Sequence, residues 1–180
     1  MSIIKHDFEK MNITKIKQSK NNKKLTVITA YDALFSNLFS KSADMILVGD
    51  SLNMSFMGKS DTLSATLDQM IYHTKAVCNG AKDAFVITDM PFATYINKDE
   101  ALKNCARVYQ ETLASAVKIE GGEDKADIIK HLTSNAIAVM GHIGLMPQYV
   151  RSEGGYKVRG KTLEDEEQLI RDAIAVEKAG

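Results

Sequence analysis

The sequence predicts an α/β fold built on a parallel sheet. From residue 25 onward, short apolar runs rich in β-branched residues alternate with longer amphipathic segments. Nearly continuous apolar runs are typical of strands covered on both faces, and strands separated by helices favour parallel pairing through right-handed crossovers.

Each predicted strand is four or five residues long and opens a new strand–helix unit. The strands are expected at residues 25–29, 45–48, 85–88, 116–119 and 137–140.

Helix start signals separate these strands. Thr66 and Gln69 form a capping-box pair before an apolar stripe, and Asn97 stands at the same place before the next helical segment. Thr162 precedes an acidic first turn, which favours a helix N-terminus. Helices are therefore expected at residues 7–17, 33–40, 67–79, 97–113, 125–135 and 162–180.

Two architectures fit five such units: a five-stranded doubly wound sheet, and part of a (β/α)8 TIM barrel. The length of 180 residues suits the first, because a whole barrel takes about 250 residues. Gly180, however, lies where a helix C-cap would lead into a sixth strand. We therefore favour a single barrel domain over residues 1–180, which covers about the first five βα units and ends before strand six.

Composition narrows the class of protein. The 23 basic and 23 acidic side chains cancel, which argues against nucleic-acid or membrane binding through bulk charge. No apolar run approaches the roughly 20 residues of a membrane helix, and the lysine-rich N-terminus lacks the apolar core of a secretory signal. Cys78 and Cys105 have no metal-binding spacing. We expect a cytoplasmic protein with neither nucleic acid nor membrane as a partner.

Polar side chains follow every predicted strand, at the end where both architectures bind ligands. They are Asp32, Asp50, Ser51, Asp89, Lys118, Glu120 and His142. Three carboxylates among them, Asp50, Asp89 and Glu120, follow consecutive strands. Hard carboxylate oxygens without accompanying thiols or several imidazoles suit Mg²⁺ rather than zinc, so a magnesium site is expected here.

Each of these residues also has a structural interpretation. Asp50 and Asp89 are of a type that often supports its own turn, and Glu120 could serve the turn at the following glycine pair. His142 could be a loop histidine with satisfied hydrogen bonds. Lys118 interrupts an apolar strand, where an ammonium group needs a carboxylate or ligand partner unless its head reaches solvent.

The segment 144–161 is glycine-rich and basic, but its spacing matches neither a P-loop nor a dinucleotide fingerprint. An anion cradle, a mobile lid and a subunit contact are all open interpretations.

Six motifs, in their order and spacing, resemble the ketopantoate hydroxymethyltransferase family. They are VITAYD (27–32), LVGDSLNM (47–54), TDMPF (88–92), VKIEGGE (117–123), GHIGLMPQ (141–148) and GGYKVRG (154–160). The resemblance implies a (β/α)8 barrel that transfers a hydroxymethyl group from methylene-tetrahydrofolate to 3-methyl-2-oxobutanoate, giving ketopantoate (2-dehydropantoate) for pantothenate and coenzyme A biosynthesis. It also implies Mg²⁺ and a homo-oligomer, commonly a decamer.

Position by position, the resemblance assigns the metal to Asp50 and Asp89. Glu120 matches a further carboxylate of the metal site, which acts through water.

The keto-acid contacts of the family match Asp50, Ser51, Asp89 and Lys118. His142 matches a histidine near the substrate. The candidate catalytic residues are accordingly Lys118 and His142.

One family feature has no counterpart here. The resemblance implies that a glutamate at the end of a later strand removes the C3 proton of the keto acid, and that strand would lie beyond residue 180. Glu177 lies on the last helix, on a side expected to face away from the site. We therefore expect the 180-residue chain alone not to turn over substrate, an expectation that detectable hydroxymethyl transfer by this chain would contradict.

Two other functional classes compete with this interpretation. A phosphoacceptor signalling domain would need an acidic pair after the first strand and a lysine after the fifth, whereas Asp32 stands alone and Lys118 lies on the fourth. A non-catalytic remnant that only assembles with longer subunits is the second alternative.

Overall fold

The computed structural model describes residues 10–180, which form a five-stranded parallel sheet in the order β1-β2-β3-β4-β5. A doubly wound sheet would reverse direction at a switch point, whereas consecutive order is that of a barrel wall. The barrel prediction is confirmed, and the doubly wound alternative is wrong, together with the signalling domain of that type. The strands are β1 (Val27–Thr29), β2 (Met45–Val48), β3 (Phe85–Asp89), β4 (Ala116–Glu120) and β5 (Val139–His142).

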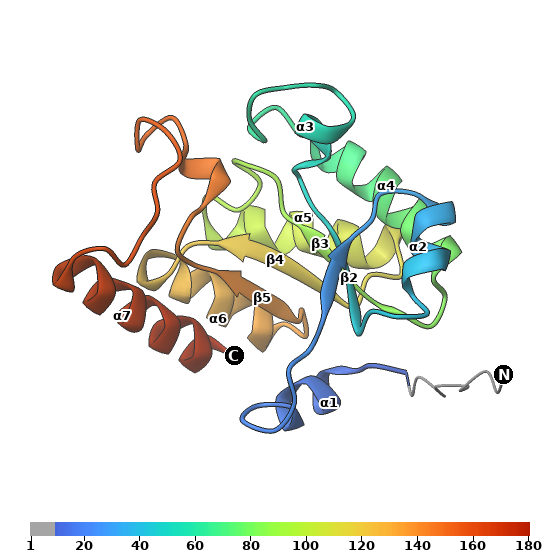
Figure 1. Ribbon diagram of the computed structural model, residues 1–180, viewed down its shortest axis with the longest axis horizontal. Coiled ribbons are helices and arrows are strands. Elements are labelled where there is room, and N and C mark those ends of the chain that lie inside the picture. Colours follow the sequence, from blue (N-terminus) through green and yellow to red (C-terminus); the bar gives the residue numbers. More distant parts are fainter. Residues whose placement is uncertain (1–9) are drawn as a thin grey trace, which may run out of the picture.

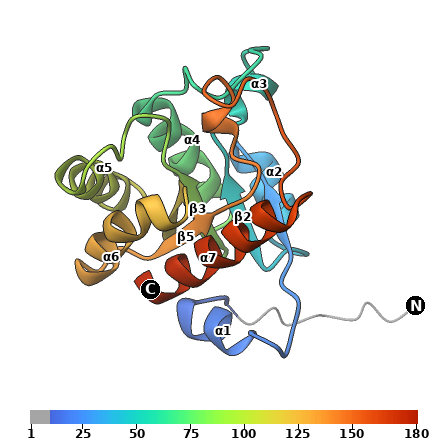
Figure 2. The same cartoon turned by 90° about the vertical axis from the view of Figure 1, so that its left-hand side faces the viewer.

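The helices that connect the strands cover one side of the sheet, as Figures 1 and 2 show. All the helices predicted after strands are present: α2 (Ala33–Phe39), α4 (Leu67–Gly80), α5 (Lys98–Glu111), α6 (Ala126–Ser134) and α7 (Leu163–Ala179). A helix before the first strand is shorter than predicted, α1 (Ile13–Gln18), and residues 7–9 of the predicted segment lie outside the described residues. Figure 1 shows α1 below the sheet, on the side opposite α3 (Leu52–Ser55).

The predicted helix caps are present in the structure. Thr66 Oγ1 accepts a hydrogen bond from the backbone N–H of Gln69, and Gln69 Oε1 accepts one from the N–H of Thr66, which completes the capping box. The side chains of Asn97 and Thr162 cap α5 and α7 by accepting from the backbone N–H of Glu100 and Asp165. Asp32 caps α2, so its carboxylate serves the helix.

Strand β5 begins at Val139, two residues later than predicted. The reason is the end of α6, where Ala136 takes a positive φ of 65° and the N–H of Ile137 bonds to Leu132 O at 3.1 Å. Residues that look like strand in the sequence therefore close the preceding helix.

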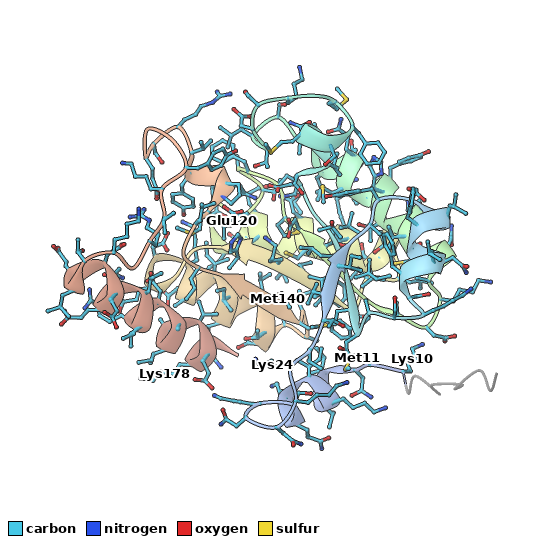
Figure 3. The ribbon with its side chains drawn as sticks, in the orientation of Figure 1. Lys10, Met11, Lys24, Glu120, Met140 and Lys178 are labelled. Atoms are coloured by element: carbon cyan, nitrogen blue, oxygen red, sulfur yellow. The ribbon has the colours of Figure 1, made fainter. Side chains whose placement is uncertain are left out.

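Alternation along the strands gives the sheet two different faces. The face toward the helices is mainly apolar and includes Ile46, Val48, Val86, Val117 and Ile119. Its buried polar residue Thr88 is hydrogen-bonded to Thr74 of α4. The opposite face holds a second apolar layer, made of Met45, Leu47, Phe85, Ile87, Ala116 and Met140. Figure 3 shows Glu120 above Met140, toward the carboxyl ends of the strands. Polar side chains therefore lie on top of an apolar layer on this second face.

Both cysteines, Cys78 and Cys105, are buried and free, in keeping with a packing role. Among residues 10–180, no helix has the length and apolarity that crossing a membrane requires.

The contact between α2 and α4 depends on Gly80. A methyl group at this position would overlap with the carbonyl oxygen of Ala33 and the hydroxyl of Ser36. Overpacking of this kind costs about 1–3 kcal/mol. Gly80→Ala should lower the free energy of unfolding by that amount in urea denaturation. Asn79→Ala, at an exposed neighbour, should change it by less than about 0.5 kcal/mol; equal effects would contradict the close approach.

Candidate active site

Strand register brings the predicted residues to one place. Asp89 is paired with Lys118, and Glu120 is paired with His142. Because side chains alternate, Lys118 and Glu120 point to the same face of β4. Asp50 follows β2 by two residues, so four consecutive strand ends contribute to one site.

Lys118 is the cationic centre of this site. Its Nζ lies 3.0 Å from Asp89 Oδ1 and 3.0 Å from His142 Nδ1. The Lys118 side chain is 11% exposed, so the interpretation in which its head reaches solvent is wrong. An ammonium group can only donate, so Nδ1 of His142 accepts from it. The same Nδ1 lies 3.4 Å from Glu120 Oε1.

Asp50 and Asp89 form a pair of buried carboxylates. The backbone N–H of Asp50 donates to Asp89 Oδ2 at 3.1 Å, and the two residues are 3% and 4% exposed. Burial, followed by the negative charge of Asp89, raises the pKa of Asp50 to about 7. Burial also raises the pKa of Asp89, and the positive charge of Lys118 opposes that rise. The pair therefore strongly favours a cation between or beside its oxygens.

A magnesium ion fits this donor set. Asp89 Oδ1 is buried and accepts no hydrogen bond from residues 10–180, since Lys118 approaches it as an ion pair outside hydrogen-bond geometry. Mg²⁺ usually binds one or two protein carboxylates and keeps waters or substrate oxygens as its other ligands. Asp50 and Asp89 could hold it in that way.

Glu120 stands further from this pair than the prediction of a third metal ligand requires. No group of three or more Asp, Glu, His or Cys side chains in the described part of the chain is close enough to hold one ion. Glu120 Oε2 instead accepts a hydrogen bond from the backbone N–H of Gln148 at 2.9 Å. This placement suits the water-mediated role better than direct ligation.

Ser51 has a partner that the sequence did not single out. Its Oγ lies 2.9 Å from the hydroxyl of Tyr31, and the carbonyl oxygen of Tyr31 lies 2.7 Å from His73 Nδ1. Tyr31 belongs to the first family motif, which was the available signal. His73 thus has a structural partner, and Tyr31 orients the serine hydroxyl.

Gln148 and Tyr95 are also in the site, although neither was predicted. Gln148 is 6% exposed and lies in a 3₁₀ turn, η2 (Pro147–Tyr149), six residues after the end of β5. Its Nε2 donates to Asp50 Oδ2, and its Oε1 accepts from the hydroxyl of Tyr95. A search for polar residues at strand ends misses both of them. The available signal for Gln148 was its place as the last residue of the motif GHIGLMPQ.

The two arginines of the basic loop 144–161 are engaged by acidic side chains. Arg159 pairs with Glu153 and lies 3.6 Å from Asp165. Arg151 pairs with Asp61 at 2.9 Å. These pairs disfavour an anion cradle built on the arginines, and the lid and subunit-contact interpretations stay open.

The raised pKa of Asp50 predicts a pH-dependent stability in the absence of divalent cations. An unfolded aspartate loses its proton near pH 4, whereas folded Asp50 keeps it until about pH 7. The folded state therefore binds more protons between these values, and the free energy of unfolding falls as pH rises through that window. Asp50→Asn should remove this fall and be more stable than wild type at pH 8, by on the order of 1–4 kcal/mol.

Denaturation in urea with EDTA at several pH values between 4 and 8 checks this. Asp99→Asn, at an exposed position in the first turn of α5, should keep the wild-type profile. Parallel profiles for wild type and Asp50→Asn would contradict the pKa of Asp50.

The sequence of this chain is similar to those of known proteins from a single family. The sequence profile of the ketopantoate hydroxymethyltransferase family matches residues 10–180. The chain is 87% identical over 180 residues to the 3-methyl-2-oxobutanoate hydroxymethyltransferase of Aliarcobacter butzleri (strain RM4018), which covers all of this chain and 67% of that protein. It is 69% identical over 172 residues to the enzyme of the same name from Sulfurimonas denitrificans (strain ATCC 33889 / DSM 1251), covering 96% of this chain and 65% of that one. The chain thus spans about two-thirds of the length of these relatives.

Solved structures share the fold at low identity. A phosphonopyruvate hydrolase solved with oxalate and Mg²⁺ superposes with a TM-score of 0.68 at 13% identity, over 94% of this chain and 61% of that one. A 2,3-dimethylmalate lyase, of the PEP mutase/isocitrate lyase superfamily, gives a TM-score of 0.63 at 17% identity, over 93% and 60%. On the family profile and these relatives at 87% and 69% identity, the chain belongs to the ketopantoate hydroxymethyltransferase family.

Proposed function

We propose that this protein serves the transfer of a hydroxymethyl group from methylene-tetrahydrofolate to 3-methyl-2-oxobutanoate, which gives ketopantoate in pantothenate and coenzyme A biosynthesis. The family and the names of its relatives support the reaction. The observation that carries it in the structure is the buried pair Asp50 and Asp89 beside Lys118. This is a site for a divalent cation and a small anion together.

Asp50 and Asp89 would hold Mg²⁺, which when bound supplies a Lewis acid for the keto oxygen of the substrate. Lys118 places a positive charge next to the same carboxylates. There it stabilises the substrate carboxylate and the negative charge that develops as the C3 proton leaves. These two effects favour the carbon nucleophile that the reaction needs.

The remaining residues orient the substrate. Ser51 donates a hydrogen bond to the substrate carboxylate, and the Tyr31 hydroxyl holds the serine in place. His142 faces the substrate with its Nδ1 fixed by Lys118. Glu120 supports the site through water. None of the described residues is proposed as the base that takes the C3 proton.

We also propose the finer family properties for this protein. They are a single (β/α)8 barrel domain of which residues 1–180 cover about the first five βα units, a cytoplasmic location, and a homo-oligomer, commonly a decamer. Of the alternatives, the non-catalytic remnant gains no support from a site in which Asp50, Asp89 and Glu120 are buried next to Lys118 and His142.

Binding of 3-methyl-2-oxobutanoate, measured by calorimetry with and without Mg²⁺, tests this function. The keto acid should bind at least about tenfold more tightly with Mg²⁺. Asp89→Asn should remove that difference because it removes a proposed ligand of the ion, whereas Asp99→Asn should preserve it. Binding that is absent, or that is indifferent to Mg²⁺ in the wild-type chain, would contradict the proposal.

A further inference from the structure

The side-chain amide of Gln148 is hydrogen-bonded to groups from two segments, the turn after β2 and the loop between β3 and α5. Its Nε2 donates to Asp50 Oδ2 at 2.8 Å and to the carbonyl oxygen of Met90 at 2.9 Å, and its Oε1 accepts from the hydroxyl of Tyr95 at 2.5 Å. Side chain and partners are all buried: Gln148 is 6% exposed, Tyr95 5%, Asp50 3% and Met90 0%.

These partners fix which way the amide points. The carbonyl oxygen of Met90 can only accept, and an ionised Asp50 can only accept as well. An inverted amide would set its oxygen against both, so the donor end of Gln148 must face Asp50. Tyr95 holds the other end, because its hydroxyl can donate to the amide oxygen.

The backbone of the same residue reaches a second carboxylate. The N–H of Gln148 donates to Glu120 Oε2 at 2.9 Å. One residue thus contacts a carboxylate at the end of β2 and another at the end of β4. Among residues 10–180, Gln148 is the only side chain that donates a hydrogen bond to the Asp50 carboxylate.

We propose that Gln148 is a positioning residue of the metal site, which fixes the rotation of the Asp50 carboxylate, and that Tyr95 fixes Gln148 in turn. The inference rests on the proposed function, because it assumes that Asp50 binds a divalent cation. A ligand held by an outer hydrogen bond meets the ion already oriented. Without Gln148, a buried carboxylate oxygen of Asp50 loses its donor, and the carboxylate is free to turn.

Manganese binding is the test, because free Mn²⁺ is counted directly by its electron paramagnetic resonance signal and no turnover is needed. Gln148→Met keeps the length of the side chain and removes its donor and acceptor. It should weaken Mn²⁺ binding by about tenfold or more. Tyr95→Phe should cause a smaller loss in the wild-type background and no further loss in Gln148→Met, because the two residues act in series.

Two matched controls separate positioning from loss of stability. Gln110→Met makes the same chemical change at an exposed position on α5. Tyr109→Phe removes a hydroxyl that donates to Ser115 O and accepts from Ala138 N away from the site, so it lowers thermal stability. Both should leave Mn²⁺ affinity within about twofold of wild type.

Each result decides a separate point. Wild-type affinity in Gln148→Met, or an equal loss in Tyr109→Phe, would overturn the positioning role while the metal site stands. Additive losses in Tyr95→Phe and Gln148→Met would overturn the serial arrangement. If the wild-type chain binds no Mn²⁺, the metal site of the proposed function fails, and the positioning role fails with it. If Gln148→Met does not fold, the Mn²⁺ affinities of Tyr95→Phe and Tyr109→Phe are compared instead. A loss in Tyr95→Phe alone supports the positioning role, and equal affinities overturn it.

Discussion

The contact between Lys118 and Asp89 is the interaction on which the site depends. Both side chains are buried at the end of the sheet, and either charge alone would be costly there. Strand register places them opposite one another, so the sheet itself supplies the pairing. With Asp89 compensated in this way, a second carboxylate, Asp50, can stand next to it. Among the described residues, Lys118 is therefore the one lysine or arginine paired with these two neighbouring carboxylates, and a bound cation would supply the further positive charge.

Most of the fold could be predicted because each signal was local. Thr66 with Gln69 determines where α4 begins, whatever lies around it, and the apolar strand runs determine the strands. The beginning of β5 could not be predicted in this way, because Ile137 and Ala136 serve the end of α6. Strand order is also not local, so the barrel was favoured from Gly180 and the family motifs, and the strand order in the structure confirmed it.

The site residues near strand ends could be predicted from the sequence, whereas those on later turns could not. Asp50, Asp89, Lys118 and His142 lie at or near the carboxyl ends of strands, and the rule that parallel strands end at one edge brings them together. Gln148 comes from a turn several residues after a strand, and its position depends on how the chain returns over the sheet. No periodicity encodes that path. Glu120 was predicted at the end of β4, where it lies, but its hydrogen bond to Gln148 depends on the same path.

The sheet of the described residues has two edge strands. Strands β1 and β5 are its two edges, and the β1 residues Val27 and Ile28 are 46% and 36% exposed. An apolar edge strand offers unpaired backbone groups to any other extended segment, which makes it a template for strand addition. In the described residues, the β1 edge of the sheet is therefore apolar and open to such a segment. Adding a strand to either edge would extend the wall in the direction in which a barrel closes.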